Sequence, residues 1–279
     1  MYRDENTGQL QGLSRVRSIT QDDAHVFCRL DQVKDEARAM ANIITKFYEA
    51  FQMPLKARLS VNDPAKPEEY LGSPEVWEKA VGTLKELLSD MNQDYFLGVG
   101  EAAFYGPKID FIATDAIGRE WQLATIQLDF NQPERFELEY IDTNNEKQRP
   151  VIIHRAILGS LERFTGVMIE HFAGAFPMWL APEQVRIATV ADEYLDAAKT
   201  MKEKLEVMNV RVHLDDSAEK VGKKIRDAAM AKVPWTIVVG AKERDGGDIQ
   251  VKVFGSDEAL VIPQADLVVR AIESSKLPS

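Results

Sequence analysis

Three short stretches of the chain gather charged and polar side chains that suit the binding of an anion or a metal. Residues 2–27 carry three arginines and a histidine, residues 103–110 end in Lys108-Ile109-Asp110, and residues 154–163 run from His154 to Arg163. Guanidinium groups bind phosphate and carboxylate oxygens through paired hydrogen bonds, and neutral imidazole is a common metal ligand. These stretches hold the sequence's candidates for chemistry.

Each stretch also has an ordinary structural interpretation. An acidic run such as Asp22-Asp23 is usually a turn or a cap, and a single histidine beside a strand is more often a hydrogen-bonded core residue than a ligand. The sequence contains no P-loop, G-x-G-x-x-G fingerprint, Cys-x-x-Cys pair or His-Glu-x-x-His helix. Taken one at a time, the three stretches leave both interpretations open.

Composition and charge narrow the class of protein. The chain has 279 residues, is 45% hydrophobic and has a formal net charge of −11, which favours two folded domains and excludes a surface that is positive throughout. A local patch can still attract phosphate, and one stretch of the carboxyl-terminal part gathers basic residues: Lys220, Lys223, Lys224, Arg226 and Lys232. Phosphate binding and a solvated helix face are both open interpretations of that cluster.

The apolar runs and the cysteine content bear on location. No run reaches the roughly 20 apolar residues that a membrane-spanning helix needs. The single cysteine, Cys28, cannot form a disulfide within the chain, and no secretory leader follows Met1. We expect a cytoplasmic protein without a membrane partner.

The elements that position the first part of the chain combine helices with antiparallel strands. Apolar residues at steps of three and four predict helices over residues 31–51 and 74–91, and alternating runs over residues 108–141 predict strands and turns. Residues 2–27 are expected to form a strand, a loop and a second strand. A strand over residues 150–154 is expected to lead into a helix that Gly159 opens, with apolar residues on one stripe: Ile157, Leu161, Phe164, Met168 and Phe172.

The pattern of expected secondary structure changes after two closely spaced prolines, Pro177 and Pro182. We therefore place the domain boundary between residues 181 and 182. Beyond it, strands and helices alternate as in a parallel sheet with crossover helices. The expected strands are 185–190, 210–214, 235–239 and 249–254, and the expected helices are 194–208, 220–231 and 265–272. The sequence thus predicts an antiparallel α+β domain over residues 1–181 and an α/β domain over residues 182–279.

Taken together and in this order, these segments resemble the threonyl-tRNA synthetase family of class II aminoacyl-tRNA synthetases. Arg3, Glu5 and residues 12–25 are similar to motif 2 of that family, and residues 159–164 are similar to motif 3. The resemblance implies a class II catalytic domain over residues 1–181, lacking the amino-terminal part that includes motif 1, and an anticodon-binding domain over residues 182–279. It also implies a homodimer for the complete enzyme, because motif 1 builds the dimer interface in this family.

The activity implied by the resemblance is that of a threonine–tRNA ligase. ATP activates threonine to threonyl-adenylate, and the threonyl group passes to tRNA(Thr). Arg3 and Arg163 are the implied catalytic residues. The implied ATP-binding residues are Arg3, Glu5, Arg15, Gln122 and Arg163, with Mg²⁺ accompanying the nucleotide, and the implied threonine-binding residues are Gln21, Asp23, Tyr105, Lys108 and Gln127.

The resemblance further implies a zinc ion that binds the amine and hydroxyl of threonine. A site that binds the hydroxyl can reject valine by roughly 10⁴ to 10⁵, whereas an apolar pocket reaches only about 10². His25 and His154 match the two histidine ligands of the family, and the cysteine ligand is expected to be missing from this chain. The spacing of Cys28 does not fit that ligand, so we expect a buried structural thiol there.

Two hypotheses for function follow from these residues. The chain is a threonine–tRNA ligase, or it is an inactive or accessory tRNA-binding fragment without activation activity. The arginines and both histidines favour the first. The missing cysteine favours the second, as does Ile19, which stands where the family has an aromatic residue that stacks on adenine.

Overall fold

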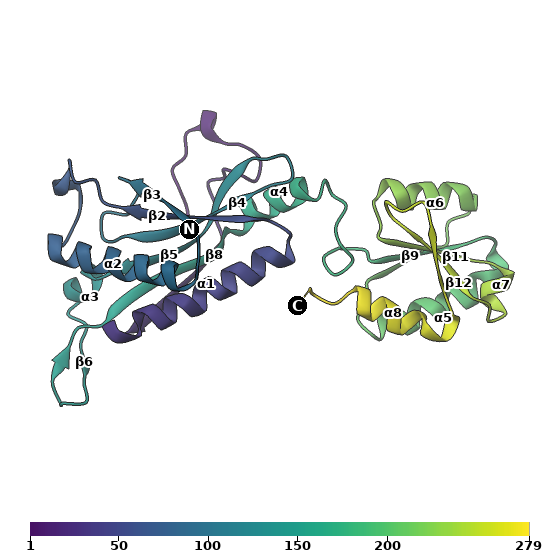
Figure 1. Ribbon diagram of the computed structural model, residues 1–279. Helices are drawn as coiled ribbons and strands as arrows, with labels where there is room; N and C mark the ends of the chain where they lie inside the picture. The colour runs from purple at the N-terminus through teal and green to yellow at the C-terminus, as the bar shows by residue number, and fades with distance from the viewer. Residues whose placement is uncertain (279) are drawn as a thin grey trace. The chain divides into compact units, whose positions relative to one another are not determined.

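A computed structural model describes residues 1–278, and its contacts divide the chain into two compact units, Met1–His171 and Phe172–Ser279 (Figure 1). The division lies before the boundary expected between residues 181 and 182. Hydrogen bonds explain the difference, because Gln184 Nε2 donates to the Met178 carbonyl at 2.8 Å and Arg211 Nε donates to the Ala181 carbonyl at 2.9 Å. Residues 172–181 therefore belong to the second unit.

The first unit is built on a six-stranded sheet with the order β1-β8-β5-β4-β2-β3. All neighbours are antiparallel except β2 and β3. The strands are β1 (Gln21–Cys28), β2 (Leu55–Val61), β3 (Tyr95–Val99), β4 (Lys108–Thr114), β5 (Glu120–Asp129) and β8 (Val151–Ser160), and a separate hairpin is formed by β6 (Tyr140–Ile141) and β7 (Lys147–Gln148). The helices are α1 (Val33–Ala50), α2 (Pro74–Asp90), α3 (Asn131–Arg135) and α4 (Leu161–His171), with 3₁₀ turns at Thr7–Gln9, Leu30–Gln32 and Pro67–Glu69.

Helices α1 and α2 pack together along the sheet (Figure 1). The buried residues Val33, Ala37, Met40 and Ile44 recur along α1 at steps of three and four, which forms one apolar stripe. Along the strands, apolar and polar residues alternate. Ile109 of β4 is buried and apolar, whereas its neighbours along the strand, Lys108 and Asp110, are polar. One face of the sheet therefore forms the core, and the other carries the polar residues described below.

The structure of the first unit differs from the sequence-based description in four places. The expected strand near residue 2 is reduced to an isolated bridge between Tyr2 and Ser18, and the stretch of expected strands and turns contains helix α3. Strands β2 and β3 were not anticipated, because they lie outside the stretch where strands were expected. Strand β8 continues to Ser160, so Ile157 lies on a strand and the helix begins only at Leu161.

The extension of β8 has a local cause. Asp22 accepts hydrogen bonds from the backbone N–H groups of Ile157 at 2.8 Å, Leu158 at 3.2 Å and Gly159 at 2.9 Å. These backbone donors are therefore satisfied without a helix. The ordinary interpretation of the acidic run is right for Asp22, because its carboxylate caps an irregular strand end.

The second unit is a five-stranded sheet with the order β10-β9-β11-β12-β13. Its strands are β9 (Val185–Thr189), β10 (Val212–Asp215), β11 (Trp235–Val239), β12 (Ile249–Val253) and β13 (Ala259–Ile262). Its helices are α5 (Leu195–Glu206), α6 (Val221–Met230), α7 (Ala241–Arg244) and α8 (Leu267–Ser274), with 3₁₀ turns at Asp192–Tyr194 and Gln264–Asp266. A core of mostly aliphatic residues, among them Val185, Ile187 and Ile237, joins sheet and helices.

The expected parallel arrangement is confirmed for β9, β10 and β11. Strand β12 runs antiparallel to β11, and β13 runs antiparallel to β12. The short connection between β11 and β12 explains the antiparallel pairing of these two strands, because a parallel crossover needs a dozen or more residues.

The basic cluster of the second unit is smaller than expected. Lys224 is 3% exposed, and its Nζ donates to the carbonyl oxygens of Thr189 and Asp215 at 3.3 and 3.0 Å. Lys224 is therefore a structural residue and no surface phosphate ligand.

Among the described residues, no helix has both the length and the apolar character that a membrane span requires.

Candidate active site

Four of the residues implied to bind threonine or zinc lie in one row across the first sheet. The strand register pairs Lys108 of β4 with Gln127 of β5, Gln127 with His154 of β8, and His154 with His25 of β1. Directly paired residues of neighbouring strands project to the same face. Residues separated by more than 100 positions in sequence are thus brought side by side, and we call these four the first row.

A second row lies next to the first on the same face. It runs from Asp110 through Thr125 and Ala156 to Asp23. Thr125 and Ala156 are small and line a pocket. The side chains at the middle of this row therefore leave room above the sheet.

That pocket has a volume of about 170 Å³ and is lined by all five residues implied to bind ATP: Arg3, Glu5, Arg15, Gln122 and Arg163. Gln21, implied to bind threonine, lines it as well, and so does Ile19. The amino-terminal loop, β5 and α4 contribute these side chains, so three distant stretches of sequence converge here. The sequence-based grouping of these residues agrees with their positions, whereas their individual roles stay predictions.

The pocket concentrates positive charge. Burial, and then the positive charges of Arg3 and Arg15, lower the pKa of Arg163, while Glu5 acts in the opposite direction. Arg15 Nη2 lies 2.9 Å from Glu5 Oε2, and Arg163 Nε donates to the Ser14 carbonyl at 2.9 Å. Guanidinium groups that line one pocket are stabilised by an anionic ligand among them.

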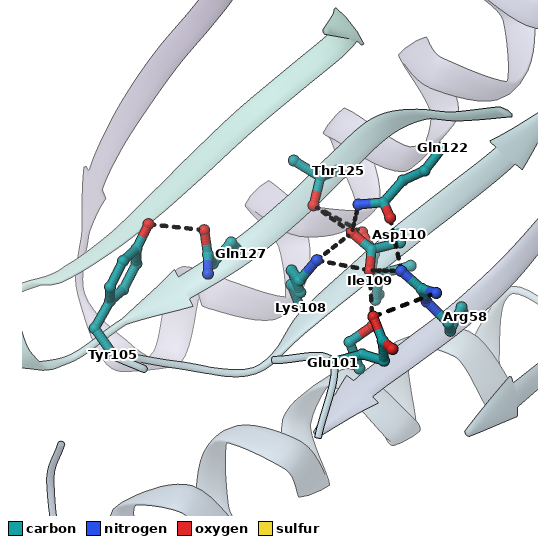
Figure 2. A network of polar contacts seen from close by, with 10 residues as sticks. Arg58, Glu101, Tyr105, Lys108, Ile109, Asp110, Gln122, Thr125 and Gln127 are labelled. Atoms are coloured by element: carbon teal, nitrogen blue, oxygen red, sulfur yellow. Dashed lines mark hydrogen bonds and ion pairs between the residues drawn. The ribbon is translucent and has the colours of Figure 1, made fainter. Parts of the chain in front are cut away.

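Gln127 in the first row has an unsatisfied donor. Its Oε1 accepts a hydrogen bond from Tyr105 Oη at 3.0 Å, and its Nε2 is buried without a hydrogen-bond partner (Figure 2). Burial, and then the charges of Asp129 and Asp23, raise the pKa of Tyr105, which keeps its hydroxyl protonated as a donor. A buried amide without a partner is costly, so this N–H₂ group is suited to a ligand that brings an oxygen.

The two histidines of the first row, His25 and His154, lie side by side as candidate metal ligands. Their ring centroids are 4.6 Å apart, and His154 Nε2 lies 3.0 Å from Asp129 Oδ2 while His25 Nε2 lies 3.9 Å from Asp23 Oδ2. No group of three or more His, Cys, Asp or Glu side chains within residues 1–278 could hold a metal ion. The described residues therefore do not complete a zinc site.

Cys28 does not supply the third ligand. It lies three residues after His25 on β1 and pairs with Val151, so it projects to the opposite face of the sheet. The thiol is buried, and burial, followed by the charges of Glu36 and Asp31, raises its pKa to about 11. A buried thiol that resists ionisation fits the structural role expected from the sequence.

The position of Gln122 depends on a β-bulge. Thr125 and Gln122 differ by an odd number of positions and would face opposite sides of a regular strand, but the register shifts between Phe111 and Ile112, so that Ile112 pairs with Gln122. Leu123 is the extra residue. The bulge brings Gln122 onto the same face as Asp110, which periodicity alone does not reveal.

Comparison with known proteins agrees with this arrangement. Residues 1–172 match the tRNA synthetase class II core domain (G, H, P, S and T), and residues 184–273 match an anticodon binding domain. A solved structure described as the RNA binding domain of threonyl-tRNA synthetase from Cryptosporidium parvum has a TM-score of 0.92 and 35% identity, covering 100% of this chain and 69% of that one. This chain belongs to the threonyl-tRNA synthetase family.

Curated relatives in the family are more similar in sequence and longer. A threonine–tRNA ligase from Prosthecochloris aestuarii is 49% identical over 90% of this chain, and one from Synechococcus elongatus is 45% identical over 100% of it. The alignments cover 38% and 46% of those two proteins, so the chain spans less than half the length of these relatives. The expected fold class, a class II core followed by an anticodon-binding domain, is confirmed.

The structure also shows functional candidates to which the sequence assigned no role. Asp110, Arg58 and Asp129 contact residues of the two rows. Asp110 lies in the stretch 103–110, and Asp129 lies only within the strands and turns expected over residues 108–141. Asp110 ends the stretch 103–110, but its burial and its partners on β2 and β5 depend on strand order. Strand β2 was not expected, so no sequence signal pointed to Arg58.

Proposed function

We propose that this chain carries the site at which threonine reacts with ATP to form threonyl-adenylate, as a part of a threonine–tRNA ligase. The observation that supports this most is the pocket lined by Arg3, Arg15 and Arg163 directly beside the first row of polar residues. One face of one sheet then offers a site for a polyanion and a site for a small polar molecule. Activation needs both at once.

ATP is proposed to occupy the arginine-lined pocket. Arg3 binds the α-phosphate and the threonine carboxylate, Arg15 helps to hold the triphosphate, and Arg163 binds its terminal phosphate. Glu5 accepts a hydrogen bond from the adenine amino group. Ile19 covers the base by van der Waals contact, and Mg²⁺ accompanies the phosphates as their counter-ion.

Threonine is proposed to lie over the first row and Asp23. Asp23 pairs with the ammonium group, and Gln21 and Tyr105 line the site. The unpartnered Nε2 of Gln127 donates to an oxygen of the substrate, and Lys108 offers positive charge at the other end of the row. His25 and His154 are two of the ligands for a zinc ion that would recognise the amine and the hydroxyl, and its third protein ligand has to come from outside the described residues.

The proposed reaction is an in-line displacement. A carboxylate oxygen of threonine forms a bond to the α-phosphorus, the bond to the bridging oxygen breaks, and pyrophosphate leaves with its charge neutralised by the arginines. The threonyl group then passes from AMP to the terminal ribose of tRNA(Thr), whose anticodon is bound by the second unit. A second copy of the chain as a dimer partner and a cytoplasmic location stay predictions.

Threonine-dependent exchange of pyrophosphate into ATP tests this proposal in the full-length protein. We expect exchange with threonine and at least 10² times less with valine. Absence of exchange at saturating threonine and ATP in a folded, zinc-supplied protein would contradict it.

The alternative is an accessory tRNA-binding protein without activation activity. The observation that favours it is that His25 and His154 have no third ligand among the described residues. In this case the protein binds tRNA(Thr) but shows neither exchange nor threonine binding. Measuring all three quantities on one preparation separates the two functions.

A further inference from the structure

Asp110 is a carboxylate with no exposed surface in the middle of β4, and the proposed reaction gives it no role. Its Oδ2 accepts hydrogen bonds from Arg58 Nη2 at 2.9 Å and Ser60 Oγ at 2.7 Å, and its Oδ1 accepts from Gln122 Nε2 at 2.7 Å and Thr125 Oγ1 at 3.1 Å. Figure 2 shows the donors from β2 and β5 converging on this one group. A buried charge requires such a set of donors.

Lys108 completes the set, because its Nζ lies 2.9 Å from Oδ1 and 2.8 Å from Oδ2 of Asp110. Lys108 belongs to the first row beside Gln127, where threonine is proposed to bind. Gln122 lines the pocket where ATP is proposed to bind. Asp110 therefore touches one residue of each substrate site.

These contacts fix the direction of both side chains. The amide of Gln122 is held at both ends, since its Nε2 donates to Asp110 and its Oε1 accepts from Arg58 Nη2 at 2.7 Å. The ammonium group of Lys108 is held by both carboxylate oxygens, which leaves one of its N–H bonds free for a substrate.

An asparagine at position 110 could not replace the carboxylate. Both oxygens of Asp110 accept from several donors, so either orientation of an asparagine amide places its N–H₂ group against other donors. The isosteric substitution Asp110→Asn thus keeps the shape of the side chain and breaks the hydrogen-bond pattern.

We propose that Asp110 is a positioning residue that directs Lys108 toward threonine and Gln122 toward ATP, and so orients one residue of each substrate site. This inference rests on the proposed function, because it assumes that the two sites hold those substrates. Asp110 itself touches neither one. It acts through the two side chains that it orients.

The test is a set of binding measurements on the full-length protein, using threonine and a non-hydrolysable α,β-methylene analogue of ATP as separate probes. Asp110→Asn is expected to raise both dissociation constants by about tenfold or more. Lys108→Met is expected to weaken the binding of threonine only, and Gln122→Ala is expected to weaken the binding of the analogue only. In the Lys108→Met background, Asp110→Asn should add little to the loss of threonine affinity, because its effect acts through the missing lysine.

Asp115→Asn is the matched control for loss of a buried carboxylate. Asp115 is 5% exposed and accepts hydrogen bonds from Arg119 Nε at 2.7 Å and Trp121 Nε1 at 3.0 Å, and none of these three residues lines the ATP pocket. We expect this variant to lose stability and keep both affinities. A merely structural role for Asp110 would make the two variants alike, with additive effects in the double variants.

The outcomes separate the inference from the proposed function. If the wild-type protein binds both probes and Asp110→Asn binds them equally well, the inference is overturned and the proposed function stands. If the wild-type protein binds neither probe, both are overturned. Should Asp110→Asn not fold, Arg58→Gln replaces it, because Arg58 Nη2 donates to both Asp110 and Gln122. The analogue should then bind more weakly while threonine affinity is kept, and unchanged affinity for both would overturn the inference.

Discussion

Gly159 of β8 and Leu123 of β5 approach so closely that a Cβ on Gly159 would lie 2.7 Å from the Leu123 carbonyl oxygen. Leu123 is the extra residue of the bulge that brings Gln122 onto the polar face. Gly159 also has φ +74°, a conformation that side chains other than glycine rarely adopt. The glycine is thus needed where β8 passes the bulge.

The substitution Gly159→Ala should destabilise the protein by about 1–3 kcal/mol and weaken ATP binding, because the bulge must shift and Gln122 with it. Urea unfolding and nucleotide titration measure the two effects. Gly118→Ala is the control, since Gly118 has φ +82° but no atom within 4 Å of a Cβ. Equal losses of ATP affinity in both variants would show that the close approach to Leu123 is unimportant.

The substitution Arg163→Ala should lower threonine-dependent pyrophosphate exchange by about 10² to 10³, the usual loss when one preorganised charge stabiliser is removed. The expected cause is the loss of a guanidinium that lines the pocket together with Arg3 and Arg15. Arg38→Ala removes an exposed arginine paired with Asp90 and should leave exchange unchanged. An unchanged rate in a folded Arg163→Ala protein would exclude Arg163 from the reaction.

Stability at acid pH should depend on Asp115. Burial alone raises the pKa of this carboxyl, but hydrogen bonds from Trp121 and Arg119 outweigh burial and lower its pKa to about 2. Since the folded pKa lies below the ordinary value, the stabilisation is complete above about pH 4 and is lost as the pH falls toward 2. Unfolding free energies of wild type and Asp115→Asn should therefore converge over that interval, and a constant difference would contradict the assignment.

Lys220, the N-cap residue of helix α6, and Lys224 within the helix should behave differently toward tRNA. Lys220 is exposed, whereas Lys224 is buried against Thr189 and Asp215. If Lys220 contacts a phosphate, Lys220→Ala reduces the slope of log affinity against log salt by about one unit or slightly less. Lys224→Met should lower the unfolding midpoint and leave the slope unchanged. A reduced slope in a folded Lys224→Met protein would show that Lys224 contacts a tRNA phosphate, and would contradict the structural role given to it here.

Local patterns sufficed for much of the fold. The apolar stripes of α1 and α2 and the alternation of β9, α5, β10, α6 and β11 depend on neighbours within a few positions, and the structure has them close to the expected bounds. The direction of β12 and the identity of β2 as a partner of β4 depend on contacts between distant segments. Periodicity contains no information on such pairing.

The site shows the same limit. The grouping of Arg3, Arg15 and Arg163 followed from motif resemblance, and the pocket brings them together. The partners of Asp110 did not follow, because they depend on which donors the neighbouring strands place around its carboxylate. Lys224 was misjudged for a related reason: its helical position suggested solvent, but the ends of β9 and β10 supply its acceptors.

Oxygen transfer from threonine to AMP tests the central claim most directly. The full-length protein is incubated with ATP, hydroxylamine and threonine labelled with ¹⁸O in its carboxylate, and the AMP is analysed by mass spectrometry. If the carboxylate attacks the α-phosphorus, hydroxylamine later breaks the bond between the acyl carbon and that oxygen, and each AMP carries one ¹⁸O. Threonine-dependent AMP without label, or formation of ADP in place of AMP, would contradict the claim.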